Sequence, residues 1–337
     1  MNLVPLIELS RGGTPECLHF GAVAVVNLQG QVVAAAGDPH WRTFSRSTLK
    51  ALQALPFMQG GGAAHFGFGS EQLAMMCASH NGEERHVAQT SLMLSRAGLN
   101  TSALRCGCHV PSYYGATETS PPPGAVFDDR HNNCSGKHAG FLAYCVQHGH
   151  PLDSYLDGGH PLQAAIRGHV ARAAGLEEGD LRAGIDGCSA PNYDLPLRNL
   201  AWAYARLASG ERDAEFGASF QALADAMTRH PDLVSGTARN DLAFMTAGRG
   251  DWVTKVGADG VQVIGSRSRG LGLAIKIADG SKPALYAATV EVLHQLGWLD
   301  EAQRTELEPW RARDIKNVRG RVVGQRTPVF RLTDGKH

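Results

Sequence analysis

Residues 44–55, Phe-Ser-Arg-Ser-Thr-Leu-Lys-Ala-Leu-Gln-Ala-Leu, are the stretch around which the rest of the chain is organised. Three leucines at helical spacing predict a helix, which Ser45 or Ser47 could cap. One helical turn places Ser47 and Lys50 on the same face. A serine becomes a nucleophile when a base takes its proton, and a partly desolvated lysine can be that base. The free N–H groups at a helix start could hold an oxyanion, so the pattern predicts an acyl-transfer site.

The composition limits the class of protein. The chain has 337 residues, enough for one large core or two moderate ones, and Lys+Arg and Asp+Glu are 32 each. A zero net charge gives no indication of a nucleic-acid or membrane partner. The first ten residues have no basic region, so we expect no signal peptide, and no apolar run reaches membrane-spanning length. Seven cysteines, an odd number, favour reduced thiols and a cytoplasmic protein.

The order of the apolar patterns predicts the fold class. Residues 19–27 and 31–36 read as a hairpin, helical patterns fill the middle, and strands return at 252–256, 261–264 and 272–277. We therefore expect an α/β protein of α+β type, with an antiparallel sheet built from both chain ends. The expected organisation is a single catalytic domain over residues 1–337. Its sheet lobe would be about 1–44 and 250–337, and its inserted helical lobe about 45–249, with the Ser47 helix at the junction.

The predicted helices between and after the strands share an amphipathic or small-residue pattern. They cover about 70–99 in two segments, 136–148, 161–174, 196–208, 216–229 and 282–298, and residues 318–330 read as a basic extended tail.

A second segment of interest is Ala78-Ser79-His80-Asn81-Gly82-Glu83, where a helical pattern ends. Ser79 could relay a proton or bind a substrate carboxylate. The alternative is a plain helix C-cap with Asn or Gly in the left-handed conformation.

A third segment, residues 131–140, gathers His, Asn, Cys, Ser and Lys just before a predicted helix. Cys134 and Cys188 could supply two thiolates to a zinc ion, although their spacing also suits buried free thiols. Asp186 could anchor a substrate ammonium group or serve only in a turn.

A fourth segment is Lys255-Val256-Gly257 on a predicted strand. Serine acyl-transferases of the penicillin-binding type place a Lys-Thr-Gly strand beside the nucleophile. Taken alone, a lysine on a hairpin is more often a solvated charge at a sheet edge.

Together these segments resemble the asparaginase II family, the Rhizobium-type (class 3) L-asparaginases, in order from about residue 5 to 330. The matching motifs are Arg46-Ser47-x-x-Lys50, Ala78-Ser79-His80-x-Gly82-Glu83, His131-Asn132-x-Cys134-Ser135-Gly136-Lys137-His138, Asp186-Gly187-Cys188-Ser189-x-Pro191-Asn192 and Lys255-Val256-Gly257-Ala258-Asp259-Gly260. The Cys-Ser-Gly-Lys-His run is far more specific than Ser-x-x-Lys. The family is similar in fold to serine β-lactamases and glutaminases.

The resemblance implies hydrolysis of L-asparagine to L-aspartate and ammonia, with Ser47 as nucleophile and Lys50 as base. Ser79 and Lys255 would form a second Ser–Lys pair. The resemblance further implies one zinc ion per chain, which aids substrate affinity rather than activating the nucleophile, and a homodimer. The implied zinc ligands are Cys134, Lys137 and Cys188, and the implied substrate-side residues are Arg46, His138 and Asp186.

Three other functions remain open from the sequence. A glutaminase would share the reaction, because one methylene changes binding by only about 1–3 kcal/mol. A penicillin-recognising serine hydrolase would carry Ser-Asp-Asn and Lys-Thr-Gly, whereas this chain has Ser79-His80-Asn81 and Lys255-Val256-Gly257. A zinc or amino-acid binding protein without catalysis would be stabilised by asparagine but would release no ammonia.

Overall fold

The computed structural model describes residues 2–311 and 313–335, and the chain divides into two compact units. The first, which we call the sheet unit, holds the residues up to Thr48, Leu195–Ala205 and the residues from Thr254 onward. The second, the helical unit, holds Leu49–Asp194 and Arg206–Val253. The chain therefore passes between the units four times. That the two units form a single catalytic domain stays a prediction.

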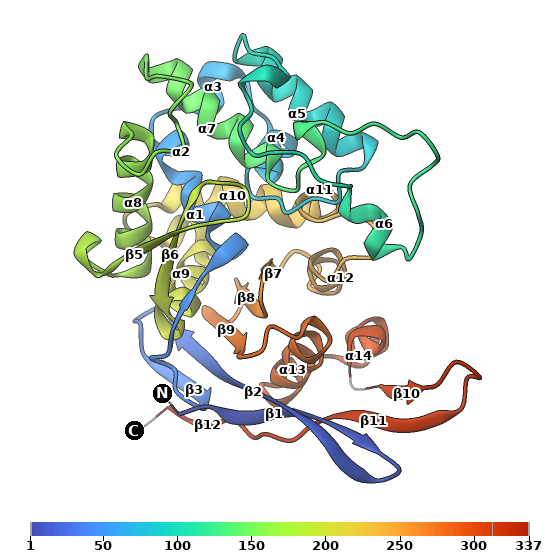
Figure 1. Cartoon of the computed structure of the whole chain (residues 1–337). Helices are drawn as coiled ribbons and strands as arrows, with labels where there is room; N and C mark the ends of the chain where they lie inside the picture. Colours follow the sequence, from blue (N-terminus) through green and yellow to red (C-terminus); the bar gives the residue numbers. More distant parts are fainter. Residues whose placement is uncertain (1, 312, 336–337) are drawn as a thin grey trace. The chain divides into compact units, whose positions relative to one another are not determined.

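The sheet unit is built around a nine-stranded sheet (Figure 1). Its main path runs β10-β11-β1-β2-β9-β8-β7, and β3 pairs with β2 and β12 with β3. The strands are β1 (Val4–Arg11), β2 (Thr14–Asn27), β3 (Val32–Ala36), β7 (Trp252–Gly257), β8 (Val261–Ser266), β9 (Leu271–Ile277), β10 (Asp314–Lys316), β11 (Val322–Pro328) and β12 (Thr333–Asp334). The pairs β1–β2, β2–β9 and β8–β9 are antiparallel, so the predicted α/β class with a sheet from both chain ends is confirmed.

Strand β2 is central because its second half is apolar on both faces. Residues Ala22–Val26 are fully buried, with β3 paired along one edge of this half of β2 and β9 along the other. Helix α13 (Lys282–Gln295) packs against β1, β9 and β11, while the first half of α9 (Leu197–Ser209) lies against β9. Gly272 allows this approach, since a Cβ there would lie 1.9 Å from the carbonyl oxygen of Ala201.

Two features of the sheet unit differ from the sequence analysis. Strand β1 was not predicted, because Pro5 and Glu8 interrupt its apolar pattern. The basic tail proves to contain β11, which pairs with β1 and is held by residues more than 300 positions away. By contrast, the hairpin joining β7 and β8 was predicted from its Asp-Gly turn, and Asp259 and Gly260 do have positive φ angles of 56° and 79°.

The remaining sheet-unit elements are short. They are β4 (Arg42–Phe44), the 3₁₀ turn η1 (Arg46–Leu49), α14 (Glu301–Glu306) and η6 (Glu308–Trp310).

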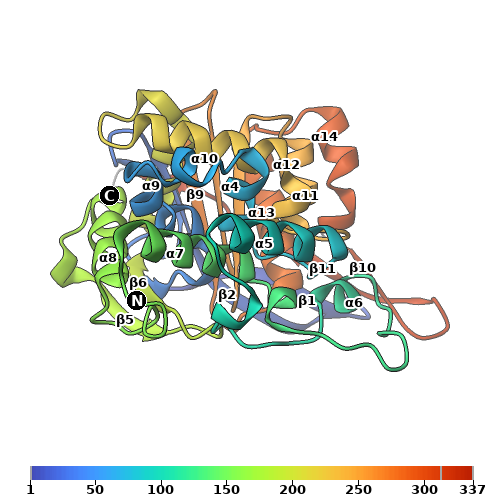
Figure 2. The same cartoon turned by 90° about the horizontal axis from the view of Figure 1, so that it is seen from above.

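The helical unit is organised on α7 (Ser135–His148), which packs against α4 and α5 (Figure 2). Gly136 and Gly140 let α4 approach closely, since a Cβ at Gly136 would lie 2.4 Å from the carbonyl oxygen of Met75. The unit also holds the antiparallel pair β5 (Arg182–Ile185) and β6 (Pro191–Pro196). Among the described residues, no helix combines the length and the apolar character needed to cross a bilayer.

The helices of this unit match the predicted segments within a few residues, apart from short ones that were not predicted. They are α1 (Lys50–Gln53), α2 (Leu55–Gln59), α3 (Gly62–Phe66), α4 (Ser70–Met76), α5 (Glu84–Arg96), η2 (Thr101–Ala103), α6 (Ser112–Ala116), η3 (Asp129–His131), α7, α8 (Pro161–Ala174), η4 (Glu178–Asp180), η5 (Gly210–Arg212), α10 (Gly217–Arg229), α11 (Pro231–Val234) and α12 (Asn240–Ala247), with the end of α9.

The stretch at 44–55 differs from the single capped helix that was expected. It forms the 3₁₀ turn η1, then α1, and α2 begins at Leu55. The residue before α1 is Leu49, which has no side-chain capping bond, so neither serine caps α1 itself, and Ser45 stands directly before η1. The tight turn is stabilised instead by the Thr48 hydroxyl, which donates to the Ser45 carbonyl at 2.6 Å.

Candidate active site

Lys50 and Ser79 form a buried polar pair inside the helical unit. Lys50 is the first residue of α1, and its Nζ donates to Ser79 Oγ at 3.0 Å. The same amine donates to the Ala78 carbonyl and, at 3.3 Å, to the Asn133 carbonyl. Both side chains are buried, with exposed fractions of 1% and 3%. All acceptors of this lysine within the described chain are neutral oxygens, and the Ser79 proton has no acceptor there. This hydroxyl and this amine are thus joined by a buried hydrogen bond.

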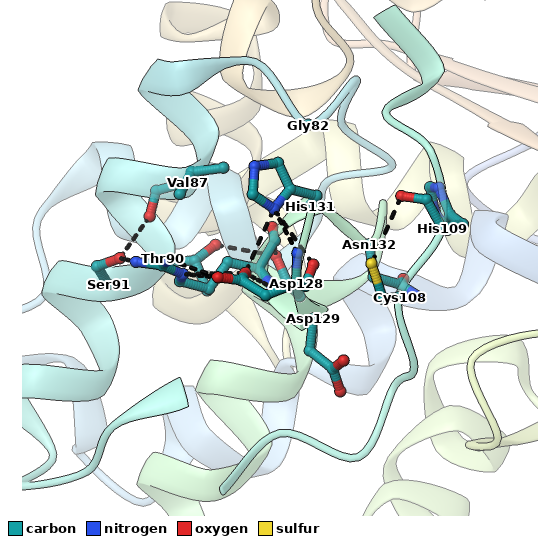
Figure 3. A network of polar contacts seen from close by, with 12 residues as sticks. Gly82, Val87, Thr90, Ser91, Cys108, His109, Asp128, Asp129, His131 and Asn132 are labelled. Carbon is teal, nitrogen blue, oxygen red and sulfur yellow. Dashed lines mark hydrogen bonds and ion pairs between the residues drawn. The ribbon is translucent and has the colours of Figure 1, made fainter. Parts of the chain in front are cut away.

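The turn that carries Ser79 is fixed from both sides. Its backbone N–H donates to the Val234 carbonyl at 2.9 Å, and the N–H of His80 donates to the Asn133 carbonyl at 3.2 Å. Gly82 has a φ of +74°, and a Cβ there would lie 2.8 Å from the carbonyl oxygen of His131 (Figure 3). The glycine thus permits a close approach as well as a turn, and Ser79 faces Lys50 from a rigid backbone. The plain C-cap interpretation does not account for the Lys50 contact.

His80 belongs to the support of this turn. Its Nδ1 accepts from the N–H of Gly82 at 3.1 Å, and its Nε2 lies 2.9 Å from Ser135 Oγ. Burial, followed by the fields of His86 and Lys50, lowers the pKa of His80 well below its ordinary value. The imidazole is therefore neutral, with its proton on Nε2.

A second network joins the turn to the loop before α12. Asn81 Nδ2 donates to the Thr237 carbonyl at 2.8 Å, and Glu83 accepts from the Thr237 N–H at 2.8 Å. Arg239 donates through Nη1 to Asn81 Oδ1 at 2.8 Å. No carboxylate within the described residues pairs with Arg239. This half-buried cation therefore contacts the turn at Asn81, which stands two positions after Ser79 in the sequence.

Thiols and a second lysine form another buried cluster in the helical unit. Lys137 Nζ donates to Cys188 Sγ at 3.1 Å. A hydrogen bond from Cys134 and the charge of Lys137 lower the pKa of the Cys188 thiol far below its usual range. The bond to Cys188, and burial, raise the pKa of Cys134. Burial opposes the ammonium of Lys137, but the Cys188 thiolate raises its pKa overall. The cluster therefore holds a thiolate, a thiol and an ammonium group.

His138 connects this cluster to Tyr155. The Tyr155 hydroxyl accepts from the N–H of Arg105 at 3.0 Å and lies 2.7 Å from His138 Nδ1. Among the described residues the hydroxyl proton has no other acceptor, so it goes to Nδ1, which places the imidazole proton on Nε2. That Nε2 has no nitrogen or oxygen partner among the described residues and faces Cys188. Burial lowers the pKa of His138, so this N–H belongs to a neutral ring.

Asp186 lies in the turn between β5 and β6. Its Oδ1 accepts from the N–H of Gly187 at 2.8 Å, which is the turn role that the sequence left open. The carboxylate is half-buried and close enough to Lys137 to raise its pKa. The structure thus brings Cys134, Lys137, His138, Asp186 and Cys188 into one neighbourhood.

The other predicted residues, Arg46, Ser47 and Lys255, belong to the sheet unit. Arg46 has a φ of 51° and forms an ion pair with Asp259. A Cβ at Gly257 would lie 2.9 Å from the Ser45 carbonyl oxygen and 3.3 Å from Arg46 Cβ. The strand that carries Lys255 therefore packs directly against the turn that carries Ser47. Lys255 is fully buried, so it is not a solvated charge, although its strand β7 ends the path of the sheet.

These residues fall into two units described separately, Ser47 and Lys255 in one, Lys50 and Ser79 in the other. The pairing of Ser47 with Lys50, and of Ser79 with Lys255, therefore stays a prediction.

The comparison with known families is informative. The family model described as L-asparaginase II matches residues 7–328. The chain belongs to the L-asparaginase II family. The family identified from the sequence is confirmed, and the family supports an amidohydrolase acting on a small amide. No curated protein matches the chain.

Two solved structures show similarity to this L-asparaginase II family member. One is a β-lactamase from Mycobacterium bovis, with 17% identity and a TM-score of 0.42, covering 82% of this chain and 94% of that chain. The other is a protein from Bacteroides dorei assigned as a β-lactamase, with 12% identity and a TM-score of 0.41, covering 81% and 93%.

The sequence analysis missed several residues of this region. Tyr155 and Arg239 were not singled out, because single tyrosines and arginines carry no local signal. The Asn133 carbonyl was missed because backbone acceptors are invisible in a sequence. The density of polar residues around 131–140 pointed to the segment that holds Asn133, but not to Tyr155 or Arg239.

Proposed function

We propose that this member of the L-asparaginase II family hydrolyses L-asparagine to L-aspartate and ammonia through an ester on Ser47, with Lys50 as base. The observation that carries the proposal is the buried Lys50–Ser79 pair. It supplies an amine and a hydroxyl that can exchange a proton away from water.

The proposed reaction has two halves. Ser47 Oγ attacks the side-chain amide carbon, its proton passes to Lys50, and backbone N–H groups near η1 hold the oxyanion. The C–N bond then breaks, and the leaving nitrogen takes the proton and departs as ammonia. Water attacks the ester with Lys50 again as base, and the Ser47–carbonyl bond breaks to give aspartate and the free hydroxyl.

Ser79 and Lys255 are proposed as a second Ser–Lys pair that tunes the charge around the first. The contact of Ser79 with Lys50 supports the idea that Ser79 lies beside the proposed base and tunes its charge. Lys255 is completely buried on a strand that packs against the Ser47 turn, which supports the idea that Lys255 lies near the nucleophile.

The thiol cluster fits the zinc ion that the family resemblance implies. Among the described residues, no three His, Cys, Asp or Glu side chains form a metal-binding group, so a zinc site here needs Lys137 as a ligand. The donors suit zinc, because Cys188 is already a thiolate and Lys137 contacts it. We propose that Cys134, Lys137 and Cys188 would hold it. Zinc would supply a positive centre that strengthens substrate binding, and the His138 Nε2–H would steady the Cys188 thiolate.

Two arginines are candidates for the α-carboxylate of the substrate. The charge of Arg46 is balanced by Asp259, whereas Arg239 contacts only the neutral amide of Asn81 within the described residues. Because an unbalanced guanidinium binds a carboxylate more strongly, we propose Arg239 as the main anchor and Arg46 as a secondary one. Asp186 is proposed for the α-ammonium group. The substrate role of His138 stays a prediction, and we propose that the ring acts through Cys188, since its Nδ1 contacts Tyr155.

The Rhizobium-type (class 3) assignment, a homodimer and a cytoplasmic location also stay predictions.

The deciding experiment measures ammonia release from asparagine and from glutamine for the wild type and Ser47→Ala. We expect activity on asparagine, little on glutamine, and a loss of roughly a thousandfold or more in the variant. Ser95→Ala, which removes an exposed helix hydroxyl, is the control and should keep full activity.

Equal activity of Ser47→Ala and the wild type would show that Ser47 is not the nucleophile. Equal activity on both amides would favour a glutaminase, and hydrolysis of nitrocefin would favour a penicillin-recognising enzyme.

The carboxylate anchor is tested with 3-aminopropanamide, which keeps the amide and ammonium groups of asparagine but lacks the α-carboxylate. Arg239→Met should lower kcat/KM for asparagine by about 10- to 50-fold and leave that of 3-aminopropanamide unchanged. The control is Arg167→Met, because Arg167 donates to the Glu178 and Leu181 carbonyls. An equal loss with both amides would show that Arg239 only supports the turn.

A further inference from the structure

A pocket in the helical unit lies beside the Ser79 turn, and its lining does not include Ser79 or Lys50. Its volume is about 490 Å³, within the range of small-molecule sites. The turn contributes Gly82 and Glu83, and α5 contributes Glu84 and Val87. The opposite wall comes from the long connection between α5 and α7. The catalytic proposal uses neither this wall nor this space.

The wall is a chain of aromatic rings. The ring centroids of Tyr113 and Tyr114 are 5.4 Å apart, those of Tyr114 and Phe127 6.2 Å, and those of Phe127 and His131 5.2 Å. All four side chains are half-buried, so their faces are fixed by packing while one side remains open to the pocket. Aromatic faces attract cations through their quadrupole.

Several polar groups in the pocket have no partner within the described residues. They are the hydroxyls of Tyr113 and Tyr114, the Nε2 of His131 and the carboxylate of Glu84. Figure 3 shows why His131 is oriented, since dashed lines join its ring to Asp128. Its Nδ1 lies 3.1 Å from the N–H of Asp128, which leaves Nε2 as the free end. A pocket with fixed rings and unused polar groups is typical of a ligand site.

The charge of the pocket selects the kind of ligand. Glu83 shares the guanidinium of Arg85 with Asp232 and is hydrogen-bonded to Thr237, so its charge is partly balanced. Glu84 lines the same pocket, is exposed and has no ion pair among the described residues. No lysine or arginine lines the pocket. The site therefore offers one unbalanced negative charge next to aromatic faces.

We propose that this pocket binds a small organic ammonium ion, whose charge pairs with Glu84 and whose apolar part lies on Tyr114 and Phe127. The ligand class is distinct from the amide that is hydrolysed, and the proposal does not depend on asparaginase activity. Ligand binding here would affect the Ser79 turn, because Gly82 and Glu83 belong both to the pocket and to the turn.

The probe is phenethylamine, compared with the neutral alcohol 2-phenylethanol of nearly the same shape. Isothermal titration calorimetry of the full chain should give saturable binding of the amine with a Kd of about 1 mM. The alcohol should bind several-fold more weakly. Equal binding of the two, or no saturation by the amine up to about ten times that concentration, would overturn the proposal.

Matched variants locate the binding. Glu84→Gln should weaken the amine about three- to fivefold, and Phe127→Ala about three- to tenfold. Glu301→Gln is the control, because Glu301 is likewise an exposed first residue of a helix but lies far along the chain in α14. Thermal melting of each variant checks that it is folded. If Glu84→Gln and Glu301→Gln bind the amine equally, the pocket is not the site.

Discussion

Two buried lysines of the helical unit, Lys50 and Lys137, differ in what faces their amines. Lys50 donates to a hydroxyl and two carbonyl groups, all neutral oxygens. Lys137 donates to Cys188, whose thiolate raises the pKa of Lys137 in spite of burial. Both lysines are almost completely buried, so the difference between their environments comes from the groups that face each amine. The amine of Lys137 faces a thiolate, whereas that of Lys50 faces neutral oxygens, and only Lys50 is proposed as the base.

The largest expected effect is on the reaction itself. Lys50→Met should lower kcat for asparagine by about a thousandfold or more, because the proposed base is lost. Lys137→Met should act mainly on KM, by about 10- to 100-fold, because the proposed zinc site is weakened. Steady-state ammonia release, with zinc content measured for each protein, separates the two. If Lys137→Met lowers kcat as much as Lys50→Met does, the division of roles between the lysines fails.

A smaller effect is expected on the thiolate. In metal-free protein, Lys137→Met should raise the pKa of Cys188, since the charge of Lys137 is one of the groups that lower it. The thiolate absorbance near 240 nm should then decrease at neutral pH, whereas Lys50→Met should leave it largely unchanged. An unchanged spectrum in Lys137→Met would mean that the bond from Cys134 alone maintains the thiolate.

The smallest expected effect is on stability. The pKa of His80 is lowered in the folded state, so below its ordinary value of 6.5 only the unfolded chain takes up the proton. The free energy of unfolding should therefore decrease as the pH falls, by up to about 1.4 kcal/mol per pH unit below about pH 6.5. Urea unfolding at several pH values should show a shallower slope for His80→Gln. An identical slope would mean that other buried histidines account for the acid sensitivity.

Local chemistry explains which elements could be predicted. The hairpin at Asp259-Gly260 and the longer helices between Ser70 and Arg229 follow from turn residues and apolar spacing. Strand β1 could not be predicted, because its pairing with β11 depends on residues at the other end of the chain. The single capped helix expected at 44–55 was wrong because the chain forms a 3₁₀ turn there, which separates Ser45 and Ser47 from the start of α1.

The candidate site shows the same division. Ser79, Lys137 and Cys188 stand in distinctive motifs and were found from the sequence. The partner of Ser79 was assigned as Lys255, whereas within the helical unit its hydroxyl contacts Lys50. Arg239 and Tyr155 make contacts that arise only from chain folding, and Asn81 and Arg239 are 158 positions apart. Residues of this kind can be identified only from the folded structure, which shows the contacts they make.

The pairing of β2 with β9 has a consequence for synthesis of the chain. Asn27 pairs with Leu271, so β2 leaves the ribosome long before its neighbour exists. At usual elongation rates the delay is on the order of tens of seconds. During that time the apolar run Ala22–Val26 has an unpaired edge, which other nascent chains could join. We therefore expect chains truncated before β9 to aggregate, and productive folding in the cell to depend on chaperones that shield this strand.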